Sequence, residues 1–513
     1  MIKILKEILK FLTSRLFIIM FMFLIYLSLL AGITIYFSYY SLGILIVLEV
    51  ISIITALIIL HRDFNPAYKI SFILLVLLLP LVGVVYYYTF GRDRYSKKRL
   101  AEIEKSSKIN ESLLNDNFPF NRNNYNETCD EFRKVSNIIS NYTDMNYFSD
   151  TETKLLTPGE KLFEQLKVEL KKAKKFIFME YFIIEPGLMW NEIFEILKEK
   201  AASGVDVRVL YDDFGCLNKV PYNFKNTLTS NNIKVKIFNP IKPHFKGIMN
   251  YRDHRKICIC DGYVGFLGGA NIADEYINEI DKFGYWKDTS VMLKGNGVWN
   301  LTVLFFTMWD DNRTVEEVLK YTPQVIHKPK DPGYVQVFGD STFDKGLTTE
   351  YVYMSLINNA KKYVYITSPY LIIDNEMITA LKIAAKSGVD VRLILPHIPD
   401  KKVIFWVTQS HYKELILAGV KIYEYLPGFL HAKTIVSDDE HSMVGTANLD
   451  FRSLYLHFEV SAYMYKTKAT KELINDFNES LKVSKEITLE NCPKIGIFKG
   501  LILFLIKAFT PMM

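Results

Sequence analysis

Apolar residues gather in three stretches near the N-terminus, which run from Leu16 to Phe37, from Leu42 to Leu60 and from Ile70 to Phe90. Each stretch is close to the roughly 20 residues that an α-helix needs to cross a bilayer core. A cleaved signal peptide would show one short apolar region followed by small residues and a cleavage site, and the sequence has no such pattern. We therefore predict an N-terminal membrane region over residues 1–90, with two or three transmembrane helices.

Basic residues on both sides of this region bear on its topology. Four lysines and arginines precede the first stretch, and five follow the third within residues 92–99. The positive-inside rule then places both ends in the cytoplasm, which three full spans cannot satisfy. Asn65-Pro66 is typical of a tight link between two spans, so the first stretch is the doubtful one. We expect a multi-pass protein of the cell membrane with its catalytic domains on the cytoplasmic side.

After a polar, Asn-rich linker over residues 91–150, the chain repeats one pattern of β-rich and helical segments. Ala173-Lys-Lys-Phe-Ile-Phe returns as Ala360-Lys-Lys-Tyr-Val-Tyr, and Ser203-Gly-Val-Asp-Val-Arg returns unchanged at Ser387. Each copy reads as a βαβ unit, which predicts a largely parallel sheet covered by helices. We expect an α/β fold with two homologous domains, residues 151–327 and 340–490, related by a pseudo-twofold axis.

The final segment, residues 494–513, carries apolar residues at helical spacing, interrupted by Lys499 and Lys507. It is long enough to cross a bilayer, but the two lysines and Gly500 favour an amphipathic helix in the membrane interface. A buried helix that packs on the second domain is the alternative.

Composition and charge narrow the classes of partner. An apolar fraction of 50% beside 23% charged residues fits a chain with a membrane part and a soluble part, and the net charge of +6 suits a surface that faces anionic lipid. The five cysteines form no CxxC pair, so neither a zinc site nor a disulfide framework is expected. The sequence has no Gly-x4-Gly-Lys-Ser/Thr loop for a nucleotide and no basic, aromatic-lined cluster for a nucleic acid.

One five-residue pattern occurs once in each repeat with the same spacing. A Lys stands two residues after a His, an Asp follows five residues later, and a Gly-x-x-Asn element begins seven residues after the Asp. A lone His-x-Lys carries no information, but two copies at equivalent points of two repeats indicate a functional site. The copies are His254, Lys256, Asp261, Gly268 and Asn271, and His431, Lys433, Asp438, Gly445 and Asn448.

The spacing of this motif suits phosphodiester chemistry. Residues i and i+2 of a strand project from the same face, so each His and its Lys share a pocket. If the two halves face each other, one imidazole can attack phosphorus while the other protonates the leaving alkoxide. The lysines and the amides of Asn271 and Asn448 would hold the phosphate oxygens. The two histidines must then begin in opposite protonation states, and no cluster has metal-ligand spacing, so we expect neither a metal nor another cofactor.

Acidic residues are needed to orient the two rings through their second nitrogens. Asp288 lies 34 residues after His254 and Glu459 lies 28 residues after His431, each just beyond the Gly-x-x-Asn element of its half. A surface or structural carboxylate is the alternative for both. Asp261 and Asp438 are further catalytic candidates, but at strand ends a turn-forming role suits them at least as well.

The doubled motif resembles that of the phospholipase D superfamily, and the sequence around it is similar to bacterial cardiolipin synthases. The resemblance runs from about Leu42 to the C-terminus, and His457 departs from it because the family usually has Asn near this position. The segments that carry it are Asn250–Lys256, Gly268–Glu275, Trp286–Asp288, Pro369–Tyr370, Pro427–Lys433 and Gly445–Ser453.

This resemblance implies a sandwich-like α/β fold and metal-free chemistry through a phosphohistidine. It implies that two phosphatidylglycerols are joined into cardiolipin and glycerol, with His254 as the nucleophile and His431 as the acid and base. The near symmetry of the halves leaves the reverse assignment open. A phospholipase that hydrolyses lipid would use the same residues. A membrane-bound nuclease and a non-enzymatic scaffold are further alternatives, and a scaffold would be favoured only if one motif were broken.

Overall fold

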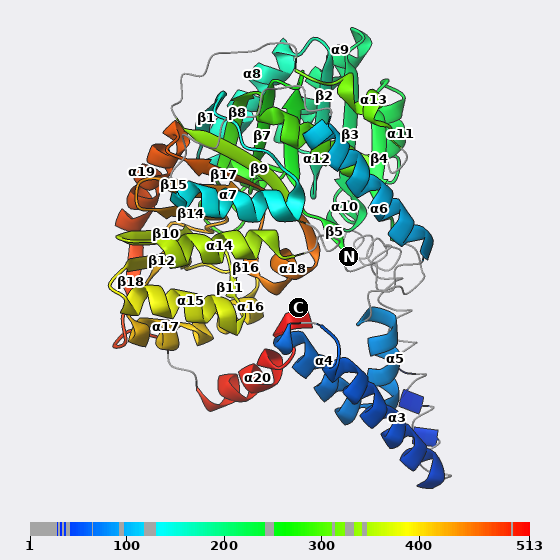
Figure 1. The fold of residues 1–513 in the computed structure, drawn as a ribbon, viewed down its shortest axis with the longest axis vertical. Coiled ribbons are helices and arrows are strands. Elements are labelled where there is room, and N and C mark those ends of the chain that lie inside the picture. Colours follow the sequence, from blue (N-terminus) through cyan, green and yellow to red (C-terminus); the bar gives the residue numbers. More distant parts are fainter. Residues whose placement is uncertain are drawn as a thin grey trace, which may run out of the picture.

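Two β-sheets covered by helices form the body of the protein, and a group of apolar helices lies below it (Figure 1). The computed structural model describes residues 28, 31–32, 35–36, 42–63, 65–91, 97–116, 130–241, 251–309, 313–323, 333–340, 346–493 and 496–512.

The first sheet has seven strands in the order β1-β8-β7-β6-β2-β3-β4. Strands β2, β3 and β4 run parallel, and the other neighbours pair antiparallel. The prediction of a largely parallel sheet is therefore wrong, because the βαβ units account only for β2, β3 and β4 and the remaining strands pair antiparallel beside them. The strands are β1 (Thr151–Leu156), β2 (Phe176–Tyr181), β3 (Asp206–Asp212), β4 (Lys234–Phe238), β6 (Lys256–Cys260), β7 (Val264–Gly268) and β8 (Ser290–Gly295). The helices of this half are α8 (Gly159–Lys172), α9 (Leu188–Ala202), α10 (Asp213–Cys216), α11 (Phe224–Thr229), η4 (Asp274–Ile277), α12 (Val298–Trp309) and α13 (Val315–Leu319).

The second sheet runs in the order β18-β13-β12-β10-β14-β15-β17-β5, with β9 also paired to β17. Its strands are β5 (Arg252–Asp253), β9 (Tyr334–Asp340), β10 (Tyr363–Thr367), β12 (Asp390–Pro396), β13 (Lys421–Tyr425), β14 (Thr434–Ser437), β15 (His441–Gly445), β17 (His457–Tyr465) and β18 (Ser484–Ile487). A separate short pair joins β11 (Leu371–Ile372) to β16 (Leu449–Asp450). The helices are α14 (Thr348–Asn359), α15 (Asn375–Lys386), α16 (Lys402–Ser410), α17 (Tyr412–Ala418), α18 (Phe451–Tyr455) and α19 (Lys468–Lys482).

The two sheets share one topology, as the sequence repeat predicts. The order β8-β7-β6-β2-β3-β4 in the first corresponds to β17-β15-β14-β10-β12-β13 in the second, and β1 and β9 take equivalent places beside β8 and β17. The exception is β5, which belongs to the first half of the sequence but pairs with β17 of the second sheet. This crossing joins the halves next to the first motif.

Alternating side chains divide each strand between two cores. On β2, Phe176 and Phe178 enter a core that contains α12 and residues of both sheets. Ile177 and Met179 point to the opposite face, against α8 and α9. One core therefore continues from the first half into the second, which holds the two sheets in a fixed relation.

The second predicted apolar stretch forms one helix with the predicted bounds, whereas the third is divided between two helices. The chain forms α3 (Leu42–Leu60), α4 (Pro66–Leu78) and α5 (Pro80–Phe90). The prediction of one span over Ile70–Phe90 is wrong, because the helix is interrupted at Pro80, whose ring cannot continue the hydrogen-bond ladder. Gly83 of α5 packs directly against the backbone of Leu75, so α4 and α5 form a hairpin. Asn65 caps α4, as expected of a tight link after α3.

No helix within the part of the chain that the structure describes is both long and apolar enough to cross a membrane. Most of the predicted span Leu16–Phe37 lies outside the described residues.

The predicted linker over residues 91–150 contains packed helices. These are α6 (Lys97–Glu111), the short π-helix η1 (Ser112–Asp116) and α7 (Asp130–Thr143). On α7, Phe132, Val135 and Ile139 are fully buried against α14 and β9, so the prediction of a polar linker is wrong there. Their spacing of three and four residues is that of an amphipathic helix. The many asparagines in this region make its overall composition polar, so the periodicity of these apolar residues is easily missed.

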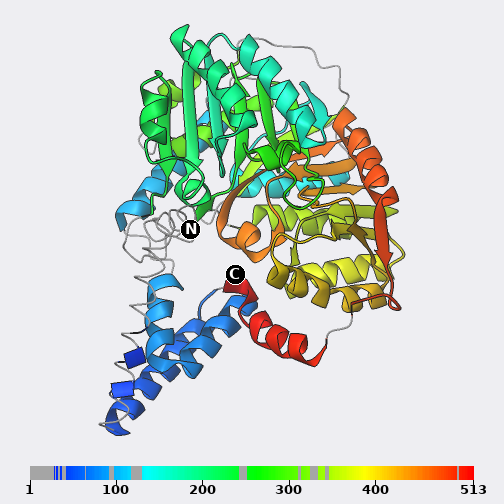
Figure 2. The same cartoon turned by 180° about the vertical axis from the view of Figure 1, so that it is seen from behind.

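The C-terminal segment forms α20 (Ile497–Lys507) and the turn η5 (Thr510–Met512). In both views α20 lies below the second half of the body and to one side of α4 (Figure 2). Leu503 is buried in a cluster with Val407 and Phe451, whereas Leu501 and Phe504 are exposed. The helix therefore has one face docked on the second half and one apolar face open.

Candidate active site

Both motif histidines lie where one half of the chain meets the other. His254 stands between β5 and β6, and its backbone N–H donates to the carbonyl of Phe458 on β17 at 2.9 Å. His431 precedes β14, and its N–H donates to the carbonyl of Lys287 at 2.7 Å. The backbone of each histidine is thus bound to the opposite half of the chain, at the residue just before the acidic candidate of that half.

The orienting acids cross between the halves. The Nδ1 of His254 lies 2.9 and 3.0 Å from the two carboxylate oxygens of Glu459, and the Nδ1 of His431 lies 2.6 Å from Asp288. The structure brings both predicted acids to histidines, but each acid serves the histidine that is remote in sequence. A carboxylate on Nδ1 fixes the ring and directs Nε2 to the reacting group.

The two motif lysines lie beside the two histidines. Lys256 donates to the carbonyl of His254, and Lys433 donates to the carbonyl of His431. Burial lowers the pKa of Lys256 to about 7, and the charge of Lys433 contributes to this shift. Burial lowers the pKa of Lys433 to about 8. Because the charge of Lys433 lowers the pKa of Lys256, the two motifs lie close enough to interact, and a phosphate anion between them would favour the charged form of both lysines.

Both imidazoles are held neutral in the free protein. Burial lowers the pKa of His254 to about 3, although Glu459 acts in the opposite direction. Burial, together with Lys433, lowers the pKa of His431 to about 4. The expected opposite protonation states are therefore not a property of the free site, because desolvation disfavours the cation on both rings.

The acids stay ionised in spite of their burial. Burial acts to raise the pKa of Glu459, but His254 outweighs it and the net shift is downward. For Asp288 burial is likewise outweighed, mainly by Lys433 and then by His431. Each ring therefore faces a carboxylate that can stabilise a positive charge once one forms.

The amides predicted to bind phosphate are engaged by the protein. Asn271 donates to the hydroxyl of Tyr276 at 2.7 Å and accepts the N–H of Ile183 at 3.0 Å. Asn448 lies 3.4 Å from a carboxylate oxygen of Asp450. Both side chains are buried, and phosphate binding by either one stays a prediction.

The catalytic assignment of Asp261 and Asp438 is corrected. Asp261 follows the far end of β6 from Lys256, roughly 16 Å along the strand at about 3.3 Å per residue. Its carboxylate accepts three backbone N–H groups at the start of β2, from residues 174–176, at 2.7–3.0 Å. Asp438 does the same for residues 361–363 at the start of β10. Both have positive φ, so they shape a turn and anchor a neighbouring strand.

The two histidine environments are equivalent in backbone but differ in side chains. Glu459 receives an additional hydrogen bond from Thr446. The place of Thr446 in the other half is taken by Gly269, where a Cβ would meet the Asp288 carboxylate at 2.1 Å. Asp288 therefore requires a glycine beside its carboxylate, whereas Glu459 has a hydroxyl donor at the equivalent position. Sequence reasoning missed Thr446, although it lies inside the Gly-x-x-Asn element.

Aromatic rings line the two imidazoles. Phe182 packs edge-on to His254 at 5.0 Å between ring centroids, and Trp286 lies 5.3 Å from His431. These rings explain the strong desolvation of both sites. Trp286 had a signal in the Trp-x-Asp spacing before Asp288, whereas Phe182 follows β2 with no distinguishing pattern.

One cluster of described residues has the composition of a metal site. It consists of His254, His457 and Glu459, whose ligand atoms lie within 4.8 Å of one another. Glu459 is already hydrogen-bonded to His254 and Thr446, and Lys256 is a close cation. A dication would have to displace these bonds against that charge, so the donor set does not suit a resident metal.

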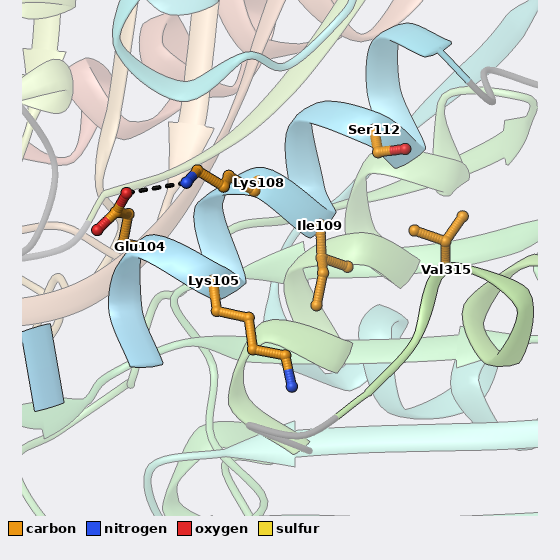
Figure 3. A pocket seen from close by; sticks show the side chains of 6 residues that line it. All are labelled: Glu104, Lys105, Lys108, Ile109, Ser112 and Val315. Atoms are coloured by element: carbon orange, nitrogen blue, oxygen red, sulfur yellow. Dashed lines mark hydrogen bonds and ion pairs between the residues drawn. The ribbon is translucent and has the colours of Figure 1, made fainter. Parts of the chain in front are cut away.

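A surface pocket of about 400 Å³ lies along α6. Figure 3 shows its lining, in which Lys108 pairs with Glu104 at 2.9 Å. None of its six lining residues belongs to the motifs, so we assign it no part in the chemistry.

Two comparisons with known proteins first give the class of protein to which this chain is similar. The family model described as the phospholipase D-like domain of cardiolipin synthase matches residues 166–282 and 353–481, one match in each half. The crystal structure of phosphatidylserine synthase from Haemophilus influenzae has the same fold, with a TM-score of 0.54 at 13% identity, over 74% of this chain and 98% of that one.

Full-length relatives then narrow the class. A cardiolipin synthase of Halalkalibacterium halodurans is 35% identical over 87% of this chain and 89% of its own length. One from Alkalihalophilus pseudofirmus is 34% identical over 92% of this chain and 94% of its own. An uncharacterised protein of Streptococcus mutans is 46% identical over 71% of this chain and 79% of its own length. The chain belongs to the cardiolipin synthase family of the phospholipase D superfamily.

Proposed function

We propose that this protein transfers a phosphatidyl group from one phosphatidylglycerol to a hydroxyl of a second, which yields cardiolipin and glycerol. The observation that carries the proposal is the pair of buried imidazoles, each with a carboxylate on Nδ1 and a lysine beside it. Exchange of one phosphodiester for another needs no nucleotide, because a bond of similar energy forms for the one that breaks.

The first half-reaction forms a covalent intermediate. The Nε2 of His254, whose pKa is lowered by burial so that the ring is neutral in the free site, attacks phosphorus as the nucleophile. The bond from phosphorus to the glycerol oxygen breaks, and the leaving alkoxide takes a proton from His431. His431 gains this proton when the substrate binds, because the negative charge of the phosphodiester favours the imidazolium form of the ring. Glu459 stabilises the positive phosphohistidine ring, and Lys256 and Lys433 hold the non-bridging oxygens.

The second half-reaction reverses these roles. His431, now neutral, accepts the proton of a hydroxyl on the second phosphatidylglycerol, whose oxygen attacks phosphorus. The bond from phosphorus to Nε2 of His254 breaks, which releases cardiolipin and restores the free imidazole. Water in place of the lipid hydroxyl would give phosphatidic acid instead.

We further propose that the helices α3–α5 hold the enzyme in a membrane and that α20 lies at the interface. The helices α3–α5 have a small core of their own around Phe72 and Val76, while much of the remaining apolar surface of α3 and α4 is exposed. Exposed apolar surface of this extent calls for lipid or another partner to cover it. Helix α20, whose Leu501 and Phe504 are exposed, lies near the same end of the molecule (Figure 2). Orientation toward the cytoplasm rests on the flanking basic residues alone.

The test is product identification with the purified full chain and phosphatidylglycerol labelled in its acyl chains and in its head-group glycerol. Transfer predicts labelled cardiolipin and one free glycerol per cardiolipin. Phosphatidic acid as the main product would favour the hydrolase, and turnover of DNA with none of lipid would favour the nuclease. His254→Ala and His431→Ala serve as inactive controls for contaminating activity.

A further inference from the structure

The start of α4 is bound to the second catalytic half by polar and aromatic contacts. The side-chain amide of Asn65 donates to the hydroxyl of Tyr455 at 2.7 Å and to a carboxylate oxygen of Asp374 at 3.0 Å. The hydroxyl of Tyr455 donates to that same oxygen at 2.7 Å. Further along α4, the ring centroid of Tyr68 lies 5.7 Å from those of Phe451 and Tyr455. Helix α4 is therefore fixed to α18, in which both of these aromatic residues lie.

Helix α18 connects two parts of the candidate active site. The Gly-x-x-Asn element that contains Thr446 and ends at Asn448 lies just before it. Its last residue, Tyr455, stands four residues before Glu459, whose carboxylate holds the ring of His254. Thr446 donates to the same carboxylate. A shift of α18 would therefore be passed to the site from both ends of the helix.

The first half fixes the equivalent segment with its own residues. Asp274 stands three residues after Asn271, and its carboxylate accepts the first two N–H groups of α9 at 2.9 Å each. The residue three places after Asn448 is Phe451, whose side chain has no acceptor. Phe451 instead packs against Tyr68 of α4. The second half thus takes from α4 a support that the first half provides within itself.

We propose that Asn65 is a positioning residue, which holds α18 in place and thereby the site residues at both ends of that helix. The start of α4 then supports the active site, in addition to the membrane role proposed for α3–α5. Loss of the contact lets α18 move and displaces the Glu459 carboxylate, and a displacement of about 1 Å can slow catalysis by about 100-fold. The inference rests on the proposed function, because turnover of phosphatidylglycerol is its readout.

The contact can be reversed without loss of either helix cap. The Oδ1 of Asn65 accepts the N–H of Ala67 at 2.9 Å, and the Oδ1 of Asp374 accepts the N–H of Met377 at the start of α15 at 3.0 Å. Asn and Asp cap helices about equally well, so Asn65→Asp and Asp374→Asn each keep both caps. The first places two carboxylates against each other, and the second places two amide donors against each other. Combined, they restore one donor and one acceptor, and the hydroxyl of Tyr455 can turn to suit.

The experiment measures kcat and KM of the full chain and these three variants on a short-chain, water-soluble phosphatidylglycerol, from the release of its head-group glycerol. A soluble substrate removes the contribution of membrane attachment, and melting temperatures establish that each variant is folded in the assay. We expect each single variant to lower kcat by roughly tenfold or more with KM within about threefold, and the double variant to return to within about threefold of the wild-type kcat.

Two further variants complete the design. Ser71→Ala is the matched control, because it removes from the same helix a donor to the carbonyl of Ala508, at 2.6 Å, in place of one to α18. It should keep the wild-type kcat. Asn65→Ser keeps a capping hydroxyl and removes the donor to α18 without adding a charge. It should lower kcat as Asn65→Asp does, and it replaces that variant if Asn65→Asp does not fold.

Two results would overturn the inference. One is a kcat of both folded single variants within about threefold of wild type, which would leave α4 with a membrane role only. The other is a double variant as slow as the slower single variant, because the loss would then not arise from the contact between these two residues. A wild-type chain that releases no glycerol would instead refute the proposed function. Release of glycerol with phosphatidic acid as the product would refute transfer and leave the comparison of variants valid.

Discussion

The crossed arrangement of the acids predicts that two carboxylates with similar surroundings act on different steps. Glu459→Gln leaves His254 with a neutral amide in place of a carboxylate at 2.9 and 3.0 Å. Asp288→Asn does the same to His431, where the distance is 2.6 Å. A hydrogen bond to a charged group contributes about 1.5–3 kcal/mol, so each change should lower kcat by roughly 10- to 150-fold.

The leaving group separates the two defects. With phosphatidylglycerol the first step needs a proton from His431, but with a phosphatidyl ester of p-nitrophenol the leaving phenolate needs none. The burst of nitrophenolate in rapid-mixing experiments should therefore return close to the wild-type rate in Asp288→Asn and stay slow in Glu459→Gln. The opposite pattern would exchange the roles of the two histidines.

A matched control comes from the strand-end acids. Asp261→Asn weakens the hydrogen bonds of one carboxylate to the backbone at the start of β2. It should lower the melting temperature while the folded protein keeps its burst rate. If Asp261→Asn slowed the burst as much as Glu459→Gln, or if both Glu459→Gln and Asp288→Asn stayed within about threefold of wild type, the orienting role of the crossed acids would be refuted.

Four other outcomes follow from the structure. His254→Ala or His431→Ala should leave a folded protein with less than about 1% of wild-type turnover, and faster turnover by either would contradict the two-histidine site. Chelators should leave the chemical step unchanged, and a strict requirement for a divalent ion would refute this. Because burial raises the pKa of Glu350 from 4.5 to about 9, the folded state retains a proton that the unfolded chain releases, and stability falls as pH rises across this interval. Glu350→Gln should therefore raise the melting temperature at pH 9 but not at pH 5, and equal shifts at both would exclude this linkage. Phe504 is exposed, so Phe504→Ser should slow turnover on bilayers more than on a short-chain substrate, and equal effects on both substrates would speak against an interfacial α20. Leu503 is buried, so Leu503→Ala should instead destabilise the fold by about 2–5 kcal/mol.

Much of the structure of the two homologous halves could be predicted because their sequence pattern occurs twice in the chain. The shared spacing of His254 and His431 with their lysines singled out the candidate reacting groups, and the sequence repeat predicted two α/β halves, which share one sheet topology in the structure. The antiparallel strands of each sheet were not predicted. The helical hairpin was harder to predict. Hydropathy over Ile70–Phe90 is continuous, and only the position of Pro80 tells that the helix stops there.

The sequence by itself determined which side chains are the candidates for the chemistry, since their identity and spacing repeat, and it named Asp288 and Glu459 as candidate orienting acids. Only the tertiary structure decided which acid serves which histidine, because the bond from His254 to Glu459 spans 205 residues and depends on the pairing of β5 with β17. It also decided that Asp261 anchors the start of β2 and that His457 lies 3.6 Å from the carboxylate that holds Nδ1 of His254. The physical reason is the same in each case: a local pattern fixes the face of a strand on which a side chain projects, but its partner is set by the packing of segments distant in sequence.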